Sequence, residues 1–195
     1  MENVFLNSVL ELYKENKWKE ILKLNEQSDN PVALNLLWVW PSANNLNFIK
    51  TTLTSYNLDG IISIGCGCGL LEWIISESTG FQVVGYEINK DWWDSKYSNP
   101  KFIKLNYCET PLEKTNLNTD YALMFCYFNN GPAFSEYLNI YKGNLVIIIG
   151  PGKGNGRHTD PEPFKANFRD IKWKLHGYQE VKNSKDFIAV YVKHD

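Results

Sequence analysis

The segment Ile61–Glu72 (IISIGCGCGLLE) decides how the rest of the chain is interpreted. Its β-branched start, Ile61–Ile64, fits a strand buried on both faces. Three glycines follow at alternate positions, and Leu70–Glu77 has the apolar spacing of a helix. Glycine lets a backbone approach a ligand without a Cβ in the way, and the next helix points free N–H groups and its positive dipole end at that ligand. The segment predicts a strand, a ligand-binding loop and a helix; the alternative is a tight connection that binds nothing.

The same alternation continues along the chain. Helix-length segments, Asp91–Tyr97 and Ala133–Tyr141, separate further apolar runs, whereas Pro111–Thr119 is polar and predicts little helix. Alternating strands and helices are typical of a parallel sheet with helices on both faces. The further runs predicted as strands are Phe81–Ile88, Phe102–Leu105, Tyr121–Tyr127 and Asn144–Ile149.

The two ends of the chain differ from this middle part. Trp173–Val181 and Phe187–Lys193 leave no room for a crossover helix between them, so we expect an antiparallel hairpin at the sheet edge. Residues 2–25 have the spacing of two short amphipathic helices, and Ser42 is a predicted N-cap of a helix that ends near Tyr56. We therefore expect one domain over residues 1–195, with an N-terminal helical segment, 1–56, before an α/β core, 57–195.

Composition narrows the class of protein. The chain has 195 residues and a net charge of −2 at pH 7, which argues against a dedicated nucleic-acid binder. Its cysteines lie in or beside apolar runs, so we expect reduced thiols and a cytoplasmic protein. Cys66 and Cys68 resemble half of a metal site, but no second pair stands at suitable spacing, and small loop fillers are the preferred interpretation. Neither a signal peptide nor a membrane-spanning run is predicted.

The loop pattern discriminates between ligands. A dinucleotide fingerprint, G-x-G-x-x-G, would need a third glycine where Leu70 or Glu72 stands, and the phosphate-loop pattern is also absent. At the end of the second predicted strand, Glu87 is suited to accept hydrogen bonds from both ribose hydroxyls, and its charge would repel a 2′-phosphate. Its alternative role is that of a solvated strand end.

At this point the sequence resembles the class I S-adenosylmethionine (SAM)-dependent methyltransferases. The resemblance rests on Ile64–Gly69, on Glu87, and on five alternating strands followed by a hairpin whose last strand inserts between its neighbours. It covers roughly residues 42–193 and implies a Rossmann-like, doubly wound, mostly parallel seven-stranded α/β sheet. SAM is the implied cofactor, and a small molecule or a protein side chain is the preferred methyl acceptor. The cofactor-binding residues that it implies are Gly65, Cys66, Gly67, Cys68, Gly69, Glu87, Ile88, Asn106, Tyr107 and Cys126.

Three features depart from the family pattern. Ser63 stands where many members have an acid that contacts the ammonium of SAM, so that group is expected against backbone carbonyls or another acid such as Glu72. Asn106, expected just after the third strand, replaces a common Asp, although an amide still accepts a bond from adenine. The Asp/Asn-Pro-Pro-Tyr motif of adenine and glutamine methylases is missing after Phe125.

The resemblance places Tyr127 and Asn129 near the transferring methyl group, and strand-end packing is the alternative. Arg157 and His158 lie in the loop after the fifth strand, where they would orient an anionic acceptor, or His158 would act as a base. The alternative for both is a solvated loop. Tyr127, Asn129 and His158 are thus candidate catalytic residues, with no metal expected.

The tryptophans have several interpretations. Trp38, Trp40, Trp92 and Trp93 are predicted to pack or to anchor an oligomer, and Trp40–Ser42 is also placed to cover the ligand cavity. The N-terminal helices would then form a lid or a homodimer surface. Two rival functions stay open: a catalytically inactive methyltransferase-like interaction module, and another nucleotide enzyme such as an NAD-dependent one.

Overall fold

The computed structural model describes residues 4–26, 31–108, 115 and 117–194. Most of the polar segment Pro111–Thr119, for which little helix is predicted, lies outside these residues.

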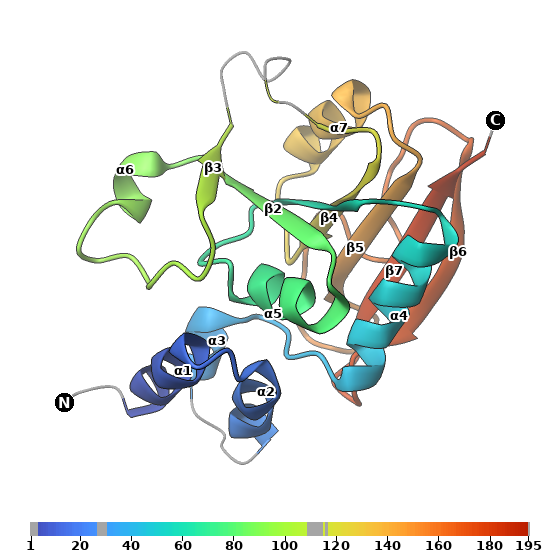
Figure 1. Ribbon diagram of the computed structural model, residues 1–195. Coiled ribbons are helices and arrows are strands. Elements are labelled where there is room, and N and C mark those ends of the chain that lie inside the picture. The colour runs from blue at the N-terminus through green and yellow to red at the C-terminus, as the bar shows by residue number, and fades with distance from the viewer. Residues whose placement is uncertain (1–3, 27–30, 109–114, 116, 195) are drawn as a thin grey trace.

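A single seven-stranded sheet carries the fold (Figure 1). Strands β1 to β5 are parallel, whereas β7 is antiparallel to both of its neighbours and lies between β5 and β6. The predicted fold class is therefore confirmed, including the insertion of the last strand. The strand order is β3-β2-β1-β4-β5-β7-β6, and the strands are β1 (Gly60–Ile64), β2 (Gln82–Glu87), β3 (Leu105–Tyr107), β4 (Tyr121–Cys126), β5 (Leu145–Pro151), β6 (Trp173–Glu180) and β7 (Asp186–Lys193).

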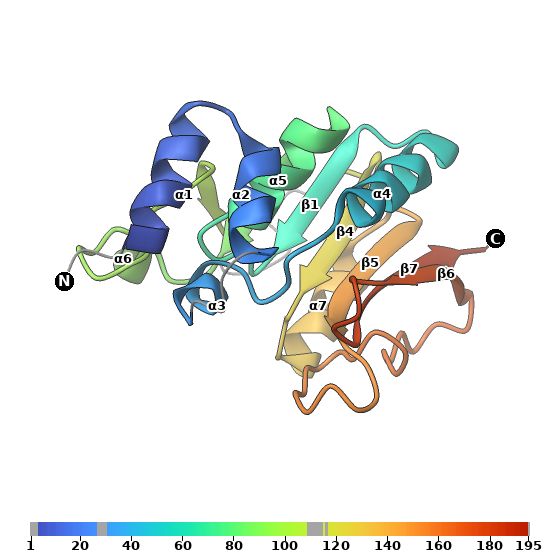
Figure 2. The ribbon, with the colours of Figure 1, turned by 90° about the horizontal axis from the view of Figure 1, so that it is seen from below.

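The helices cover the two faces of the sheet unequally (Figure 2). One face carries α4 and α5 with α1 and α2 outside them, and the opposite face carries α7. The short α6 lies beyond the β3 edge (Figure 1). The helices are α1 (Val4–Lys14), α2 (Trp18–Glu26), α3 (Val32–Leu36), α4 (Ala43–Ser55), α5 (Leu70–Thr79), α6 (Lys90–Trp93) and α7 (Gly131–Ile140).

Alternating side chains of the central strands supply two cores. Ile61 and Met124 pack with the cluster on the α5 side, whereas Ile62, Leu123 and Phe125 pack with the cluster on the α7 side. All five residues are at most 2% exposed. Apolar residues on both faces explain why the strands read as continuous apolar runs rather than as an alternation with polar residues.

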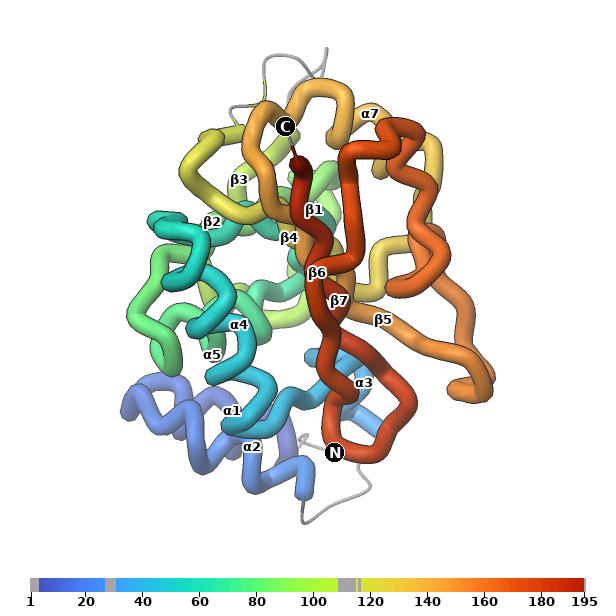
Figure 3. Tube along the Cα trace, turned by 90° about the vertical axis from the view of Figure 1, so that its right-hand side faces the viewer, coloured from blue at the N-terminus to red at the C-terminus, as the bar shows by residue number. Residues whose placement is uncertain are grey.

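Helix α4 fixes the N-terminal segment to the sheet edge, beside β6 (Figure 3). The Ser42 hydroxyl accepts from the Asn45 N–H, and the Asn45 side chain accepts from the Ser42 N–H, which forms a capping box. The same Asn45 amide group donates to the Gln179 Oε1 at 2.8 Å and to the Glu180 carbonyl at 2.9 Å. One buried side chain therefore joins the helix start to β6.

Replacing Asn45 with alanine is expected to lower the free energy of unfolding by about 2–3 kcal/mol, because the cap and two buried bonds are lost together. Asn44→Ala is the matched control, since Asn44 lies next to it on the exposed side of the helix. We expect the control to change stability by less than about 0.5 kcal/mol. Urea denaturation of both variants measures the difference, and equal values for the two would contradict the role given to Asn45.

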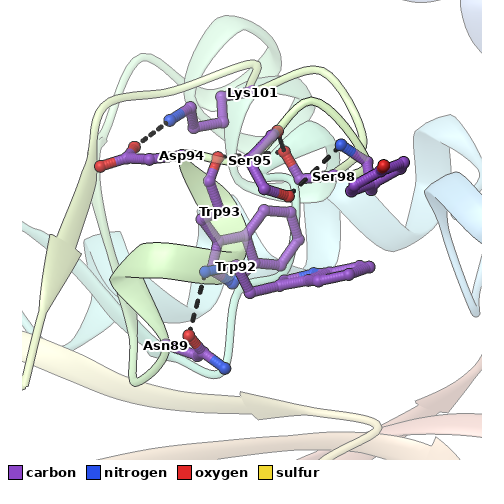
Figure 4. A network of polar contacts seen from close by, with 8 residues as sticks. Asn89, Trp92, Trp93, Asp94, Ser95, Ser98 and Lys101 are labelled. Carbon is purple, nitrogen blue, oxygen red and sulfur yellow. Dashed lines mark hydrogen bonds and ion pairs between the residues drawn. The ribbon is translucent and has the colours of Figure 1, made fainter.

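Two predicted elements differ from the structure by more than two residues in their bounds. The third strand was expected over Phe102–Leu105 but covers Leu105–Tyr107, because the Phe102 N–H donates to the Cys68 carbonyl and ladder pairing with β2 begins only at Leu105. The helix expected over Asp91–Tyr97 is the single turn of α6. Side chains compete with the backbone there, since the Ser98 hydroxyl donates to the carbonyls of Trp93 and Ser95 (Figure 4).

Candidate functional site

The glycine loop lies between the carboxyl end of β1 and the start of α5. Gly65, Gly67 and Gly69 have φ angles of 69°, 61° and 78°, a region that side-chain-bearing residues rarely adopt. The N–H groups of Gly65 and Cys66 both donate to the Tyr86 carbonyl, and the Gly67 N–H donates to the Glu87 Oε1 at 2.7 Å. The loop is thus fixed to the end of β2.

The loop uses its own N–H donors for bonds within the protein. The N–H groups of Gly65, Cys66, Gly67 and Gly69 all donate to protein acceptors. A tight loop satisfies its own donors, because unpaired ones are costly when shielded from water. At Gly67 the loop leaves open space beside its backbone, since a Cβ there would meet nothing within 4 Å.

Gly69 has a different role, as the residue before the first turn of α5. A Cβ there would overlap the side chain of Ile103. Gly69→Ala is expected to cost about 3 kcal/mol of stability, which combines a strained backbone with overpacking. Gly80→Ala is the matched control: its φ is 81° and its Cβ would meet nothing within 4 Å, so only the backbone cost of about 1–2 kcal/mol applies.

Thermal or urea unfolding of the two variants measures this difference. The additional substitution Ile103→Ala should reduce the cost of Gly69→Ala to that of Gly80→Ala, because the overlapping side chain is removed. A cost that stays the same in the Ile103→Ala background would show that this contact is not the reason for glycine at position 69.

A cavity of about 300 Å³ opens above the glycine loop. The loop Gly65–Cys68 forms its floor, the β4 end contributes Cys126 and Tyr127, and Asn35–Val39 from the N-terminal segment forms the far wall. Among the lining residues that the structure describes, the only charged side chains are Glu72 and Glu87. The cavity therefore presents negative charge and no lysine or arginine to whatever occupies it.

Glu72 is a buried carboxylate with one free oxygen. Its side chain is 1% exposed, and the Ser63 hydroxyl donates to the Oε1 at 2.7 Å. The Oε2 has no partner among the described residues. Burial raises the pKa of this carboxyl to about 7, and the bond from Ser63 opposes that shift. Many class I methyltransferases have an acid at the position of Ser63. In this chain the Glu72 carboxylate lies beside Ser63 instead.

Glu87 lies where two cavities meet. Its Oε1 accepts from Gly67, and its Oε2 lies 3.3 Å from the Ile88 N–H. A second cavity of about 190 Å³ begins at the same Gly65 and Glu87 and extends toward α7. Its walls are largely apolar and include Ile64, Ile88, Cys108, Phe128 and Ala133.

The structure separates the residues predicted to contact adenine from both cavities. Asn106 donates its side-chain amide to the Gly85 carbonyl at 3.2 Å, and Tyr107 lies with Asp94 and Lys101 on another surface. Neither lines the two cavities in the described part of the chain. Because β3 continues through Tyr107, the first residue after the strand is Cys108, which lines the second cavity.

Tyr127 and Trp38 close one side of the larger cavity. Their rings stack with centroids 5.5 Å apart and planes 13° apart. The Tyr127 hydroxyl donates to the buried Asp186 at 2.6 Å and accepts from the Arg157 guanidinium at 3.3 Å. Burial and the bond to Asp186 raise the pKa of Tyr127 to about 12. Tyr127 has a φ of 49°, which ends β4 one residue earlier than predicted.

The aromatic wall corrects the sequence interpretation of this segment. Trp38 covers the cavity, whereas Trp40 is buried with its ring 6.1 Å from that of Phe5. Among the candidate catalytic residues, Tyr127 lines the larger cavity and Asn129 the smaller one. His158 lines neither; its side chain is 70% exposed and its Nδ1 lies 3.2 Å from Glu162. The three therefore do not form one constellation.

The described residues contain neither a cluster of metal ligands nor a helix that could span a membrane. No three His, Cys, Asp or Glu side chains gather there as a metal ion would require. None of the helices there has the length and apolar character needed to cross a membrane.

Comparison with known proteins places the fold. No family model and no curated protein matches the sequence. Among solved structures, an O-methyltransferase from Bacillus cereus in complex with S-adenosylhomocysteine aligns over 99% of this chain and 92% of its own, with 16% identity and a TM-score of 0.53. A Staphylococcus aureus protein assigned as a caffeoyl-CoA O-methyltransferase aligns over 98% and 100%, with 12% identity and a TM-score of 0.51.

The chain has the class I methyltransferase fold. In this methyltransferase fold the glycine loop and Glu87 occupy the carboxyl ends of neighbouring parallel strands, where open α/β sheets bind ligands. Trp38 and the rest of Asn35–Val39 were missed as cavity residues because a short apolar run between two prolines does not indicate which neighbour it covers.

Proposed function

We propose that the protein is a SAM-dependent methyltransferase that acts on a small-molecule or protein acceptor, with the whole chain forming one domain. The observation that carries this proposal is the charge of the larger cavity, which has carboxylates at Glu72 and Glu87 and no cation among its described lining residues. SAM carries a sulfonium and an ammonium, so its positive charge is complementary to this lining. A dinucleotide pyrophosphate would be repelled by it.

The residues present fit the cofactor in four places. The unpartnered Oε2 of Glu72 is an acceptor in need of a donor, and the ammonium of SAM supplies one. Glu87 Oε2, which lies near the Ile88 N–H, would accept from a ribose hydroxyl, while its Oε1 keeps the loop in place. The open space above Gly67 accepts the ligand backbone without a clash. The apolar second cavity, beginning at Ile88, then takes the adenine.

The chemistry follows from position. Bound SAM supplies an already activated methyl group, so the protein must mainly orient the acceptor and keep water out. Trp38 and Tyr127 form a stacked aromatic wall along one side of the larger cavity, against which the acceptor would pack. Tyr127 stays protonated at neutral pH, and its hydroxyl donates a hydrogen bond to Asp186. This bond holds the ring in place, and the residue does not act as a base.

Calorimetric titration tests the proposal. SAM and S-adenosylhomocysteine are expected to bind with dissociation constants in the micromolar range, and NAD⁺ is the control that should not bind. No heat from SAM or its product at about 1 mM, or tighter binding of NAD⁺, would refute the proposed cofactor. A search for transfer of a radioactive methyl group to fractions of a cell extract then separates an active enzyme from a ligand-binding module. The cytoplasmic location is part of the proposal, supported by four free cysteines.

A further inference from the structure

A third cavity, of about 480 Å³, lies beside the loop that follows β5. Its described lining includes three cationic side chains, Lys153, Arg157 and Lys165, and one carboxylate, Glu162. Glu162 already has partners, because Lys165 lies 2.7 Å and His158 3.2 Å from its oxygens. Two cationic groups, Lys153 and Arg157, therefore form no ion pair among the described residues, and the cavity has an excess of positive charge.

Arg157 is held in place by aromatic rings rather than by a carboxylate. Its guanidinium lies 5.8 Å from the Trp38 ring and 5.9 Å from the Tyr127 ring. One of its N–H groups donates to the Tyr127 hydroxyl at 3.3 Å. A guanidinium has five N–H donors in a planar fork, so most of them stay free for a carboxylate or a phosphate.

The position of Arg157 connects this cavity to the proposed cofactor site. Tyr127 lines the proposed cofactor cavity and binds Arg157 through its hydroxyl, while Arg157 lines the third cavity. A molecule whose anionic end binds Arg157 and Lys153 has its other end near Tyr127. Phe164, 40% exposed, adds an apolar surface to the same cavity.

Building on the proposed SAM-dependent transfer, we propose that the methyl acceptor is a small molecule with an anionic group, a carboxylate or a phosphate, which Arg157 and Lys153 bind in the third cavity. The two opposite charges are kept apart: carboxylates line the cavity above the glycine loop, for the cationic cofactor, and cations line the third cavity, for the anionic acceptor. Each ligand is therefore disfavoured in the site of the other.

Titration with simple probes tests the inference without knowledge of the acceptor. Phenyl phosphate and benzoate distinguish the two anionic groups, and benzyl alcohol is the neutral control. Binding is followed by two-dimensional amide NMR of the ¹⁵N-labelled chain at low salt, where screening is weakest. We expect at least one anion to bind with a millimolar dissociation constant and to shift amides of residues 150–165, whereas the neutral probe does not bind.

Variants assign the binding to the proposed residues. Arg157→Gln is expected to weaken binding of the anion about 10-fold or more, and Lys153→Gln, which changes an exposed loop residue, should weaken it about 3-fold. Lys174→Gln on β6 is the matched control and should leave it unchanged. Arg157→Lys should restore part of the affinity, because it keeps the charge and loses the fork.

The probes are titrated into the protein alone, so the result does not depend on whether SAM binds. Anion binding that is absent at about 10 mM, or equal in Arg157→Gln, Lys153→Gln and the wild type, would overturn the inference. SAM affinity is measured separately and should stay within about 3-fold in Lys153→Gln, since Lys153 lines the third cavity and not the cofactor cavity. If the wild type does not bind SAM, the proposed function is refuted, whatever the result for the anions.

Discussion

Replacing Glu87 with alanine is expected to weaken SAM binding about 100-fold. The substitution removes the acceptor proposed for the ribose hydroxyls and the carboxylate that accepts from the Gly67 N–H at 2.7 Å. Hydrogen bonds to a charged group contribute about 1.5–3 kcal/mol each, and a loss near 2.7 kcal/mol corresponds to that factor. Glu87→Gln keeps one acceptor oxygen and should lose only about 10-fold.

Glu77→Gln is the matched control for this series, because Glu77 is exposed on α5 and carries the same charge. It should bind SAM as the wild type does. Calorimetry with SAM and with its 2′-deoxy derivative locates the contact. The wild type should bind the derivative more weakly than SAM, whereas Glu87→Ala should show a much smaller difference between the two ligands. An equal loss for both proteins would mean that Glu87 does not bind the ribose.

Glu72 is expected to make SAM binding depend on pH. In the proposed complex the ammonium of SAM binds the ionised carboxylate of Glu72, whose pKa burial raises to about 7. Affinity should therefore rise as pH rises through 7, and at pH 5.5 it should be about 10- to 30-fold lower than at pH 7.5. Glu72→Gln should bind about 30-fold more weakly than the wild type at pH 7.5 and similarly to it at pH 5.5, with a flat profile.

Stability gives a second, ligand-free measurement on the same residue. The pKa of Glu72 is raised above its ordinary 4.5, so the folded protein binds a proton that the unfolded chain releases. The resulting stabilisation is fully present below pH 4.5 and is lost as pH rises through 7, a change of about 3 kcal/mol. In Glu72→Gln this contribution is absent, so the difference from the wild type should vary across this range. If the two proteins differed in free energy of unfolding by the same amount at pH 4.5 and at pH 8, the burial of an ionisable group at position 72 would be contradicted.

A buried acid with an unpartnered oxygen is costly, and this cost is consistent with a functional role. The sequence indicated Glu72 as a replacement for the acid missing at Ser63, because both residues belong to the same strand–loop–helix segment. It did not indicate that the Ser63 hydroxyl would donate to Glu72 at 2.7 Å. That bond depends on the packing of α5 against β1, which no local pattern encodes.

Most of the sheet was predictable because its strands are buried on both faces. Runs such as Ile61–Ile64 need no partner to be recognised, and the short hairpin connection before Phe187 left only an antiparallel arrangement. The third strand was misplaced because Phe102 is apolar for another reason: it packs edge-on against the Tyr13 ring, 5.0 Å away. An apolar residue in a sequence does not show whether a strand or a distant helix buries it.

The cavity walls were the least predictable part of the candidate site. The glycine loop and Glu87 lie close together in the sequence pattern, whereas Trp38 meets Tyr127 across 89 residues of chain. Tyr127 has a positive φ and stacks on Trp38, and a bulky residue gives no sequence signal for that backbone conformation. Arg157 was expected to orient an anion, but its place over these two rings emerged only from the tertiary structure.

A crystal structure of the chain with S-adenosylhomocysteine tests the central claim most directly. We expect the ribose hydroxyls about 3 Å from Glu87, the amino group against the free oxygen of Glu72, and the adenine in the cavity beside Ile88. A ligand bound elsewhere, or a glycine loop closed over by side chains with both cavities empty at saturating ligand, would contradict the account.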